Sequence, residues 1–391
     1  MKNIAIISFF HPESSLCLTK YLAQQSSCVD YYYVANLLHD KKAISGFEYP
    51  NAKRTLGNHL LSKEEVPEMY AYMDGLPVRL FLTRIIHHER YPKFHYWLMK
   101  ALMWQIKLRH YDAINIVGQA SWVNEAHNSL KGENLIHTFH ELGNHAGELH
   151  PLQIVKSAIA DKTKVILHSK ATYDRFLSIP GADVTRTTMI PFGKFETTKL
   201  YVQEQDVPLP FTNNKPILLF YGYIAPYKGL DVLAKSIEIL KSDWDKFNII
   251  VAGAGEDPNL SFFKSLPNGF VLNKFLSNDE MMNLIRQSSA ILLPYRTASQ
   301  TGIIPTCTLY GKPFIATNVG AFSESVVNGY NGMLVEPENP DAFASAIKNV
   351  IDNPELLVRL SIGASNFGNG DQYDWNTIAK QTIEFVCSGI R

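Results

Sequence analysis

The sequence predicts an α/β protein with two domains, each built around a mostly parallel sheet with helices on both faces. The chain has 391 residues, which exceeds the usual size of one hydrophobic core and favours two domains. Short β-branched or aromatic runs alternate with amphipathic stretches, as in βαβ units. The stretch from Glu196 to Asn214 breaks this rhythm and carries two prolines before a new strand, so we interpret it as a linker.

Nine short apolar runs are predicted to be strands, and the amphipathic stretches between them to be helices. The boundaries that follow are a first domain over residues 1–195, a linker over 196–214 and a second domain over 215–371. The predicted strands are Asn3–Phe9, Ala113–Val117, Asn134–Phe139, Lys164–His168, Thr188–Ile190, Ile217–Tyr221, Asn248–Ala252, Ala290–Leu293 and Pro313–Ala316, and the clearest helical patterns are Leu230–Leu240, Asn278–Ser288 and Pro340–Asp352.

Composition and charge argue against several classes of function. Lys plus Arg and Asp plus Glu number 37 each, so no global positive charge indicates a nucleic-acid-binding protein. The four cysteines lack the spacing of a metal site or a disulfide framework, which favours a reducing compartment. No run approaches the roughly 20 apolar residues of a membrane helix. We therefore expect a cytoplasmic protein, with contact at the inner face of the cell membrane left open.

The segment from Arg79 to His110 combines basic and aromatic residues. It contains seven Lys or Arg residues, six Phe, Tyr or Trp residues and a single acid, Glu89. A basic, aromatic amphipathic stretch can lie on an anionic membrane surface. The alternative is a solvated helix face whose aromatic side packs in the core.

The loop after the strand at Ile217–Tyr221 has the composition of a phosphate site. Gly222 permits a tight backbone path, Lys228 offers a positive charge, and Gly229 precedes a helix whose amino end favours anions. The alternative for Lys228 is an exposed lysine at a helix start.

Similar loops follow other strands of the second half, and the carboxyl ends of parallel strands meet at one edge of a sheet. Their backbone amides and hydroxyls can hold phosphate and sugar hydroxyls without a metal. The loops are 251–256 with Gly253 and Gly255, 293–305 with Ser299, Thr301 and Gly302, and 311–320.

Taken together, these loops resemble family 4 of the nucleotide-sugar glycosyltransferases, retaining enzymes of the GT-B fold with two facing Rossmann-like domains. Residues 220–231 resemble the family's GR…KG phosphate loop, residues 252–256 its G-x-G turn, and residues 318–335 its NVGG…E…NG…LV run. The likeness is dense from Ile217 to Ile351. It implies a donor site made of Gly222, Lys228, Gly253, Gly255, Ser299, Gln300, Thr301, Gly302, Thr306 and Glu324.

The chain departs from the family's pattern in two respects. The family's phosphate-binding Arg falls on Tyr223, so Lys228 alone remains of that pair. Two Glu residues that normally contact the sugar and the ribose fall on Ala298 and Thr306. Residues 298–302 resemble a variant loop, A-T-Q-S-G, of some bacterial members. We interpret the change as a substitution of the loop chemistry, and it leaves the donor sugar open.

A loop rich in His and Glu follows the strand at Asn134–Phe139. A zinc site, a hydrogen-bonded structural loop and a cleft-facing role are the three interpretations. The loop resembles the family's HD…H segment, with Glu141 where Asp is usual, which implies that His140 approaches the transferred sugar or the acceptor. Glu141 and His145 would then lie on the acceptor side. His11, after the first strand, faces the cleft or belongs to a plain loop.

The resemblance also implies a mechanism and a setting. Charge grows on the leaving diphosphate, so Lys228 and the helix start after Gln300 would stabilise the transition state. No metal and no cofactor is expected, since no DxD-like run supports an obligatory divalent ion. The C-terminal helix, residues 372–391, would pack back on the first domain.

The acceptor would be a lipid-linked or polysaccharide glycan in bacterial surface-polysaccharide synthesis. A nucleotide-sugar epimerase and a catalytically silent sugar-nucleotide-binding protein are the alternatives.

Overall fold

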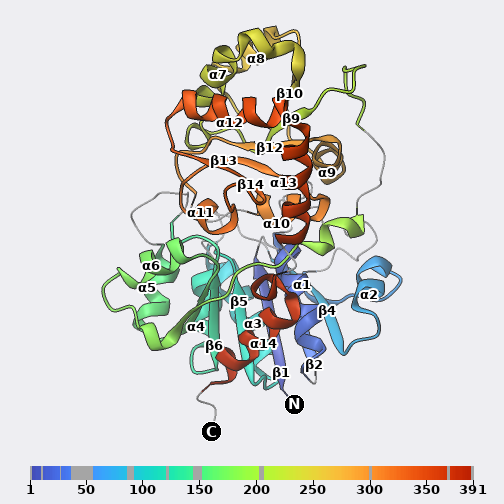
Figure 1. The fold of residues 1–391 in the computed structure, drawn as a ribbon. Helices are drawn as coiled ribbons and strands as arrows, with labels where there is room; N and C mark the ends of the chain where they lie inside the picture. The colour runs from blue at the N-terminus through green and yellow to red at the C-terminus, as the bar shows by residue number, and fades with distance from the viewer. Residues whose placement is uncertain are drawn as a thin grey trace. The chain divides into compact units, whose positions relative to one another are not determined.

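The chain folds into two compact α/β units in a computed structural model (Figure 1). Unit 1 comprises residues 1–201 and 371–391, and unit 2 comprises residues 202–370. Both contain a wholly or mostly parallel sheet between helices, so the predicted fold class is confirmed. The described residues are 2–9, 12–26, 28–36, 56–85, 92–119, 123–143, 152–201, 207–298, 302–367 and 370–388.

Unit 1 is organised around an eight-stranded sheet in the order β3-β4-β2-β1-β5-β6-β7-β8. Its strands pair in parallel, except that β3 runs antiparallel to β4. From the central strand β1, the chain first adds β2, β3 and β4 on one side and then β5 to β8 on the other. The strands are β1 Asn3–Phe9, β2 Cys28–Asn36, β3 Gly57–Leu60, β4 Val78–Ile85, β5 Ala113–Val117, β6 Leu135–Phe139, β7 Lys164–Leu167 and β8 Thr187–Met189.

Helices cover both faces of the unit 1 sheet because successive strand residues point to opposite sides. In β1, Ile4 and Ile6 face α1, α2 and α14, whereas Ala5 and Ile7 face α3, α4 and α5. Two apolar cores therefore flank one sheet. The helices are α1 Pro12–Ala23, α2 Pro67–Met73, α3 Pro92–Lys107, α4 Val123–Leu130, α5 Gln153–Ala160, α6 Lys170–Leu177 and α14 Trp375–Cys387, with short 3-10 turns at Val184–Arg186 and Glu196–Tyr201.

The C-terminal helix α14 belongs to unit 1, although it follows unit 2 in the chain. Near its start, the Trp375 indole N–H donates to the Lys194 carbonyl at 2.8 Å. At its end, the Lys164 ammonium donates to the carbonyls of Phe385 and Val386 at 2.8 and 3.1 Å. A cation suits the last carbonyls of a helix, which have no partner within the helix. These contacts fasten α14 to unit 1 at both ends.

Unit 2 contains a six-stranded parallel sheet in the order β11-β10-β9-β12-β13-β14. The chain moves outward from β9 to β11 and then returns to the other side of β9, so the carboxyl ends of β9 and β12 form the switch point where such sheets bind ligands. The strands are β9 Ile217–Tyr221, β10 Asn248–Ala252, β11 Gly269–Leu272, β12 Ala290–Leu293, β13 Phe314–Thr317 and β14 Gly332–Val335, and the helices are α7 Leu230–Ile239, α8 Leu260–Ser265, α9 Asn278–Gln287, α10 Ile303–Cys307, α11 Phe322–Ser325, α12 Pro340–Asp352 and α13 Pro354–Phe367.

The basic segment predicted as one amphipathic stretch divides into two different elements. Its first part is the buried strand β4, and its later part contains the helix α3. Arg79 on β4 forms a bidentate ion pair with the fully buried carboxylate of Asp30, with N–O distances of 2.6 and 2.8 Å. Arg109 lies 3.8 Å from the same carboxylate. Two of the seven basic residues therefore neutralise a buried acid.

Candidate functional site

The loop between β9 and α7 turns sharply, so that the ammonium of Lys228 lies next to Gly222, the first residue of the loop. Gly222 has a φ of +105°, and a Cβ placed there would lie 2.6 Å from the Lys228 Nζ atom. A 3-10 turn at Pro226–Lys228 follows, and Gly229, with a φ of +68°, is the N-cap of α7. The missing side chain at Gly222 leaves the room that the ammonium group occupies.

Lys228 is buried, so the alternative of an exposed lysine is wrong. Its side chain is 6% exposed, and its ammonium lies 5.1 Å from the centroid of the Tyr295 ring. No residue in the described part of the chain forms a hydrogen bond or ion pair with this ammonium. Burial lowers the pKa of Lys228 to about 8. A buried cation without a counter-ion is costly, and an anion that enters beside it removes that cost.

The loop after β10 packs directly against the phosphate loop. The Gly222 N–H donates to the Ala252 carbonyl at 2.9 Å, and the Ile224 N–H donates to the Ala254 carbonyl at 2.7 Å. A Cβ at Gly253 would lie 1.9 Å from the Gly222 carbonyl oxygen. This close approach accounts for the glycine at 253, and Gly255 meets Ile224 in the same way. Direct contact of either glycine with a donor stays a prediction.

These two loops and the end of β11 border an open groove of about 620 Å³ in unit 2. The exposed ring of Tyr223, which stands where the family has its second cation, lies on this groove. The groove is lined by Tyr223, Ile224, Ala225, Pro226, Ala254, Gly255, Glu256 and Asn273.

The loop after β12 reaches the same edge of the sheet. Ala298 is buried, and its carbonyl accepts from the Ala321 N–H at 2.9 Å. Gly302 is the N-cap of α10, and the Thr306 hydroxyl donates to the Gly302 carbonyl at 2.8 Å. Glu324 lies half-buried on α11. The predicted donor ligands between these points, Ser299, Gln300 and Thr301, lie outside the described residues.

In unit 1, His140 follows β6 and belongs to a cluster of three rings. His140 is 5% exposed, and its ring centroid lies 5.1 Å from that of His168 and 5.2 Å from that of Phe192. His168 and Phe192 stack at 3.8 Å. His168 Nδ1 donates to the Ile190 carbonyl at 2.8 Å, because a carbonyl can only accept. That bond fixes the His168 tautomer and the orientation of its ring.

Sequence reasoning did not include His168 or Phe192 in the site. His168 ends one predicted strand, and Phe192 lies two residues after another, in the run Ile-Pro-Phe-Gly at 190–193, so their position at a strand end was the available signal. Of the residues predicted on the acceptor side, Glu141 is described by the structure, and its N–H donates to the Gln119 side-chain oxygen at 3.4 Å. His11 and His145 lie outside the described residues.

A zinc site is one of the three interpretations of the histidine loop. Within the described ranges, no three His, Cys, Asp or Glu side chains are grouped so that they could hold a metal ion. Because His145 and Glu148 fall outside those ranges, the expectation of a metal-free site stays a prediction.

No described helix is long and apolar enough to cross a lipid bilayer.

Comparison with solved structures identifies the fold as GT-B. The Anabaena protein HepE in complex with UDP-glucose superimposes with a TM-score of 0.65 at 15% sequence identity, over 99% of this chain and all of that one. Residues 202–367, nearly the whole of unit 2, match the family described as Glycosyl transferases group 1. The predicted GT-B fold is thus confirmed, and unit 2 resembles a group 1 glycosyl transferase domain.

Curated relatives include glycosyltransferases that align with part of the chain. An uncharacterized glycosyltransferase of Methanocaldococcus jannaschii is 31% identical over 166 residues, which are 40% of this chain and 44% of that protein. A D-inositol 3-phosphate glycosyltransferase of Streptomyces griseus is 26% identical over 258 residues, or 61% of this chain and 52% of that protein. The chain thus spans about half the length of these two relatives.

Proposed function

We propose that this protein is a retaining glycosyltransferase that moves a sugar from a nucleotide-sugar donor to an acceptor. The observation that carries this proposal is Lys228, a buried cation whose described surroundings supply no counter-ion, beside the switch point of the unit 2 sheet. A diphosphate supplies the missing negative charge. The group 1 domain and the UDP-glucose complex of HepE support the same assignment.

The chemistry assigned to Lys228 follows from the reaction. When the bond between the anomeric carbon and the phosphate oxygen breaks, negative charge grows on the departing diphosphate. An ammonium held in a dry pocket stabilises that charge more strongly than one in water. The amino end of α7, which has Gly229 as its N-cap, adds a partial positive charge at the same place. No metal ion or cofactor is part of this proposal.

His140 is assigned to the sugar or the acceptor. A neutral imidazole can donate to or accept from a hydroxyl group near the reacting carbon. Its ring is held in place by His168 and Phe192, and a fixed ring loses little freedom when it binds. Glu141, with His11 and His145, is proposed to line the acceptor side. Transfer with retention is proposed from the resemblance to family 4 and is tested by the anomeric configuration of the product.

The acceptor is proposed to be a lipid-linked or polysaccharide glycan, and helix α3 to be the membrane contact. Lys93, Trp97, Lys100 and Trp104 form one exposed stripe at helical spacing, with the two Trp side chains 65% and 61% exposed. Its opposite side, with Met99, packs in the core. The aromatic side of this helix is therefore not the side that packs in the core.

The partner that fits this stripe is an anionic bilayer. Exposed Trp side chains favour the membrane interface, and α3 contains no acidic residue. Two lysines near an anionic surface are worth about 2 kcal/mol, so vesicles with phosphatidylserine should bind roughly 30-fold more tightly than neutral ones. The variant Trp97→Ala/Trp104→Ala should lose most of this binding. Phe275→Ala, which removes an equally exposed ring from unit 2, is the control. Equal binding by both variants would refute the membrane contact.

A screen of sugar nucleotides tests the enzyme assignment and the two alternatives. A ligand that binds only the folded protein raises its melting temperature, so UDP-, GDP-, ADP- and TDP-sugars are compared first. The best binder is then incubated in labelled form. Transfer or slow hydrolysis supports a glycosyltransferase. An isomerised donor would indicate an epimerase, and binding without turnover would indicate a silent sugar-nucleotide-binding protein.

A further inference from the structure

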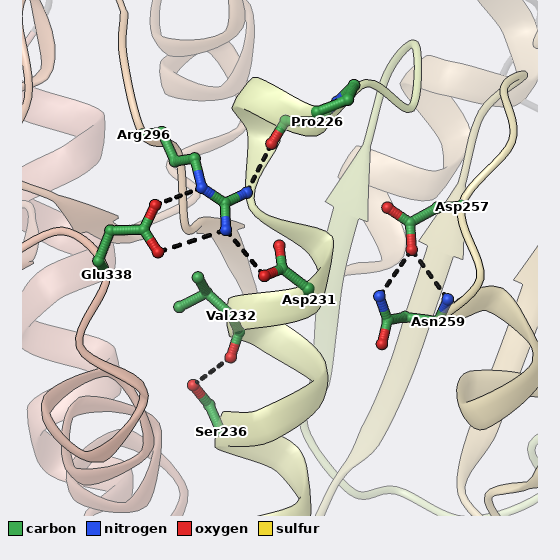
Figure 2. Close-up of polar contacts among 8 residues, drawn as sticks. All are labelled: Pro226, Asp231, Val232, Ser236, Asp257, Asn259, Arg296 and Glu338. Carbon is green, nitrogen blue, oxygen red and sulfur yellow. Dashed lines mark hydrogen bonds and ion pairs between the residues drawn. The ribbon is translucent and has the colours of Figure 1, made fainter.

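The guanidinium of Arg296 joins three loops at the carboxyl edge of the unit 2 sheet (Figure 2). Arg296 follows β12, and its Nη1 atom donates to the Pro226 carbonyl at 2.6 Å. Its Nη2 atom donates to the Asp231 carboxylate at 2.7 Å. Its Nε and Nη2 atoms also bind Glu338, which follows β14. One side chain therefore connects the phosphate loop and the first turn of α7 to two other strand ends.

The backbone around Arg296 fits the phosphate loop just as closely. The Arg296 N–H donates to the Tyr227 carbonyl at 2.7 Å. A Cβ at Gly229 would lie 2.0 Å from the Pro294 carbonyl oxygen. These contacts cross the switch point between β9 and β12, so the position of the turn that carries Lys228 depends on the loop after β12.

Lys228 needs such support because burial of its charged ammonium group is unfavourable. A buried ammonium with no described partner is drawn toward water, and it sits on a single 3-10 turn with no other helical turn before it. Arg296 binds the Pro226 carbonyl in that turn and Asp231 just beyond it. The planar guanidinium makes these bonds in several directions at once, which a lysine ammonium on a flexible stem does not reproduce.

We propose that Arg296 is a positioning residue that holds the Lys228 turn in the geometry that receives the donor diphosphate. The proposal rests on the proposed function for the identity of the anion. Arg296 is not assigned a contact with the donor, because its guanidinium is already bound to Pro226, Asp231 and Glu338. Its effect on the donor passes through Lys228.

The test measures the pKa of Lys228 itself by NMR of protein labelled with ¹³C-lysine, with the resonance assigned from Lys228→Met. Tyr295 is the titratable side chain that faces Lys228 in the described part of the chain, and burial raises the pKa of its phenol well above the ordinary value, so it stays neutral. In the wild type the pKa of Lys228 should be about 8. Arg296→Gln should release the turn and raise this pKa by at least one unit toward that of an exposed lysine.

Binding of inorganic pyrophosphate, which carries the diphosphate without a base, is measured in parallel. Arg296→Gln should weaken it about tenfold, and Arg296→Lys should restore only part of the loss. The control is Lys348→Gln, which breaks ion pairs with Asp243 and Asp352 elsewhere in unit 2. An unchanged Lys228 pKa in folded Arg296→Gln would overturn the proposal. Because the pKa is read without any transfer reaction, this outcome is distinct from failure of the proposed function.

Discussion

Replacing Lys228 with Met should stabilise the free protein while it removes anion binding. Burial lowers the pKa of this lysine from 10.5 to about 8, and each unit corresponds to about 1.4 kcal/mol. The charged side chain therefore costs about 3 kcal/mol of folding free energy at neutral pH. Methionine has a similar length and no charge, so Lys228→Met recovers up to that amount. For a unit of this size, the gain corresponds to roughly 6 to 12 °C in melting temperature.

The pH dependence has a definite sign. The unfolded chain keeps the lysine proton up to pH 10.5, whereas the folded chain releases it near pH 8. The cost is therefore complete below pH 8 and disappears as the pH rises through 10.5. The stability gain of Lys228→Met should be largest at neutral pH and should shrink in alkaline buffer.

Lys312→Met is the matched control in the same unit. The Lys312 ammonium is also partly buried, but it donates to the carbonyls of Arg286 and Ser288 at 2.8 and 2.7 Å. Its loss leaves carbonyls without a partner and should lower the melting temperature. The melting temperatures of both variants, measured without ligand, test these opposite expectations. A fall in melting temperature for Lys228→Met would refute the reasoning that its ammonium lacks a partner.

Three further predictions follow from the same structure. Pyrophosphate affinity of the wild type should fall as the pH rises above about 8, because only the ammonium form of Lys228 attracts the anion, and a pH-independent affinity from calorimetry would contradict this. His140→Ala, and to a smaller degree Phe192→Ala, should lower single-turnover transfer more than nucleotide affinity, and equal losses would make the ring cluster a purely structural feature. His137 is fully buried with its pKa held well below 6.5, so the unfolded chain takes up a proton there that the folded chain does not. Stability toward urea should therefore decrease as the pH falls below 6.5, and the decrease should be shallower in His137→Gln.

Local pattern was enough for the strands that are short and mostly apolar, such as β5, β9 and β10. It missed β2, in which Asp30 interrupts the apolar run. Asp is unfavourable in strands, and this one is tolerated because Arg79, 49 positions further along the chain, neutralises it.

The same distinction between local pattern and long-range contact applies to the candidate site. The residue types of the phosphate loop pointed to Lys228, but its burial depends on the Tyr295 ring, which lies far away in the sequence. Arg296 was invisible as a positioning residue because its partners Asp231 and Glu338 lie 65 and 42 positions away. His168 was missed for the same reason, since its contact with His140 joins two separate strand ends. Spacing within one segment reveals loop chemistry, whereas side-chain packing between segments requires the fold.

The most direct test of the central assignment is the effect of Lys228→Ala on donor binding and transfer together. The sugar nucleotide that gives the largest thermal shift is used, and nucleoside diphosphate affinity and single-turnover transfer are measured for both proteins. Loss of a charge-assisted contact with phosphate costs about 1.5 to 3 kcal/mol, so both quantities should fall by roughly one to two decades while the fold is retained. A folded Lys228→Ala protein with unchanged affinity and unchanged rate would contradict the assignment of this lysine to the donor diphosphate.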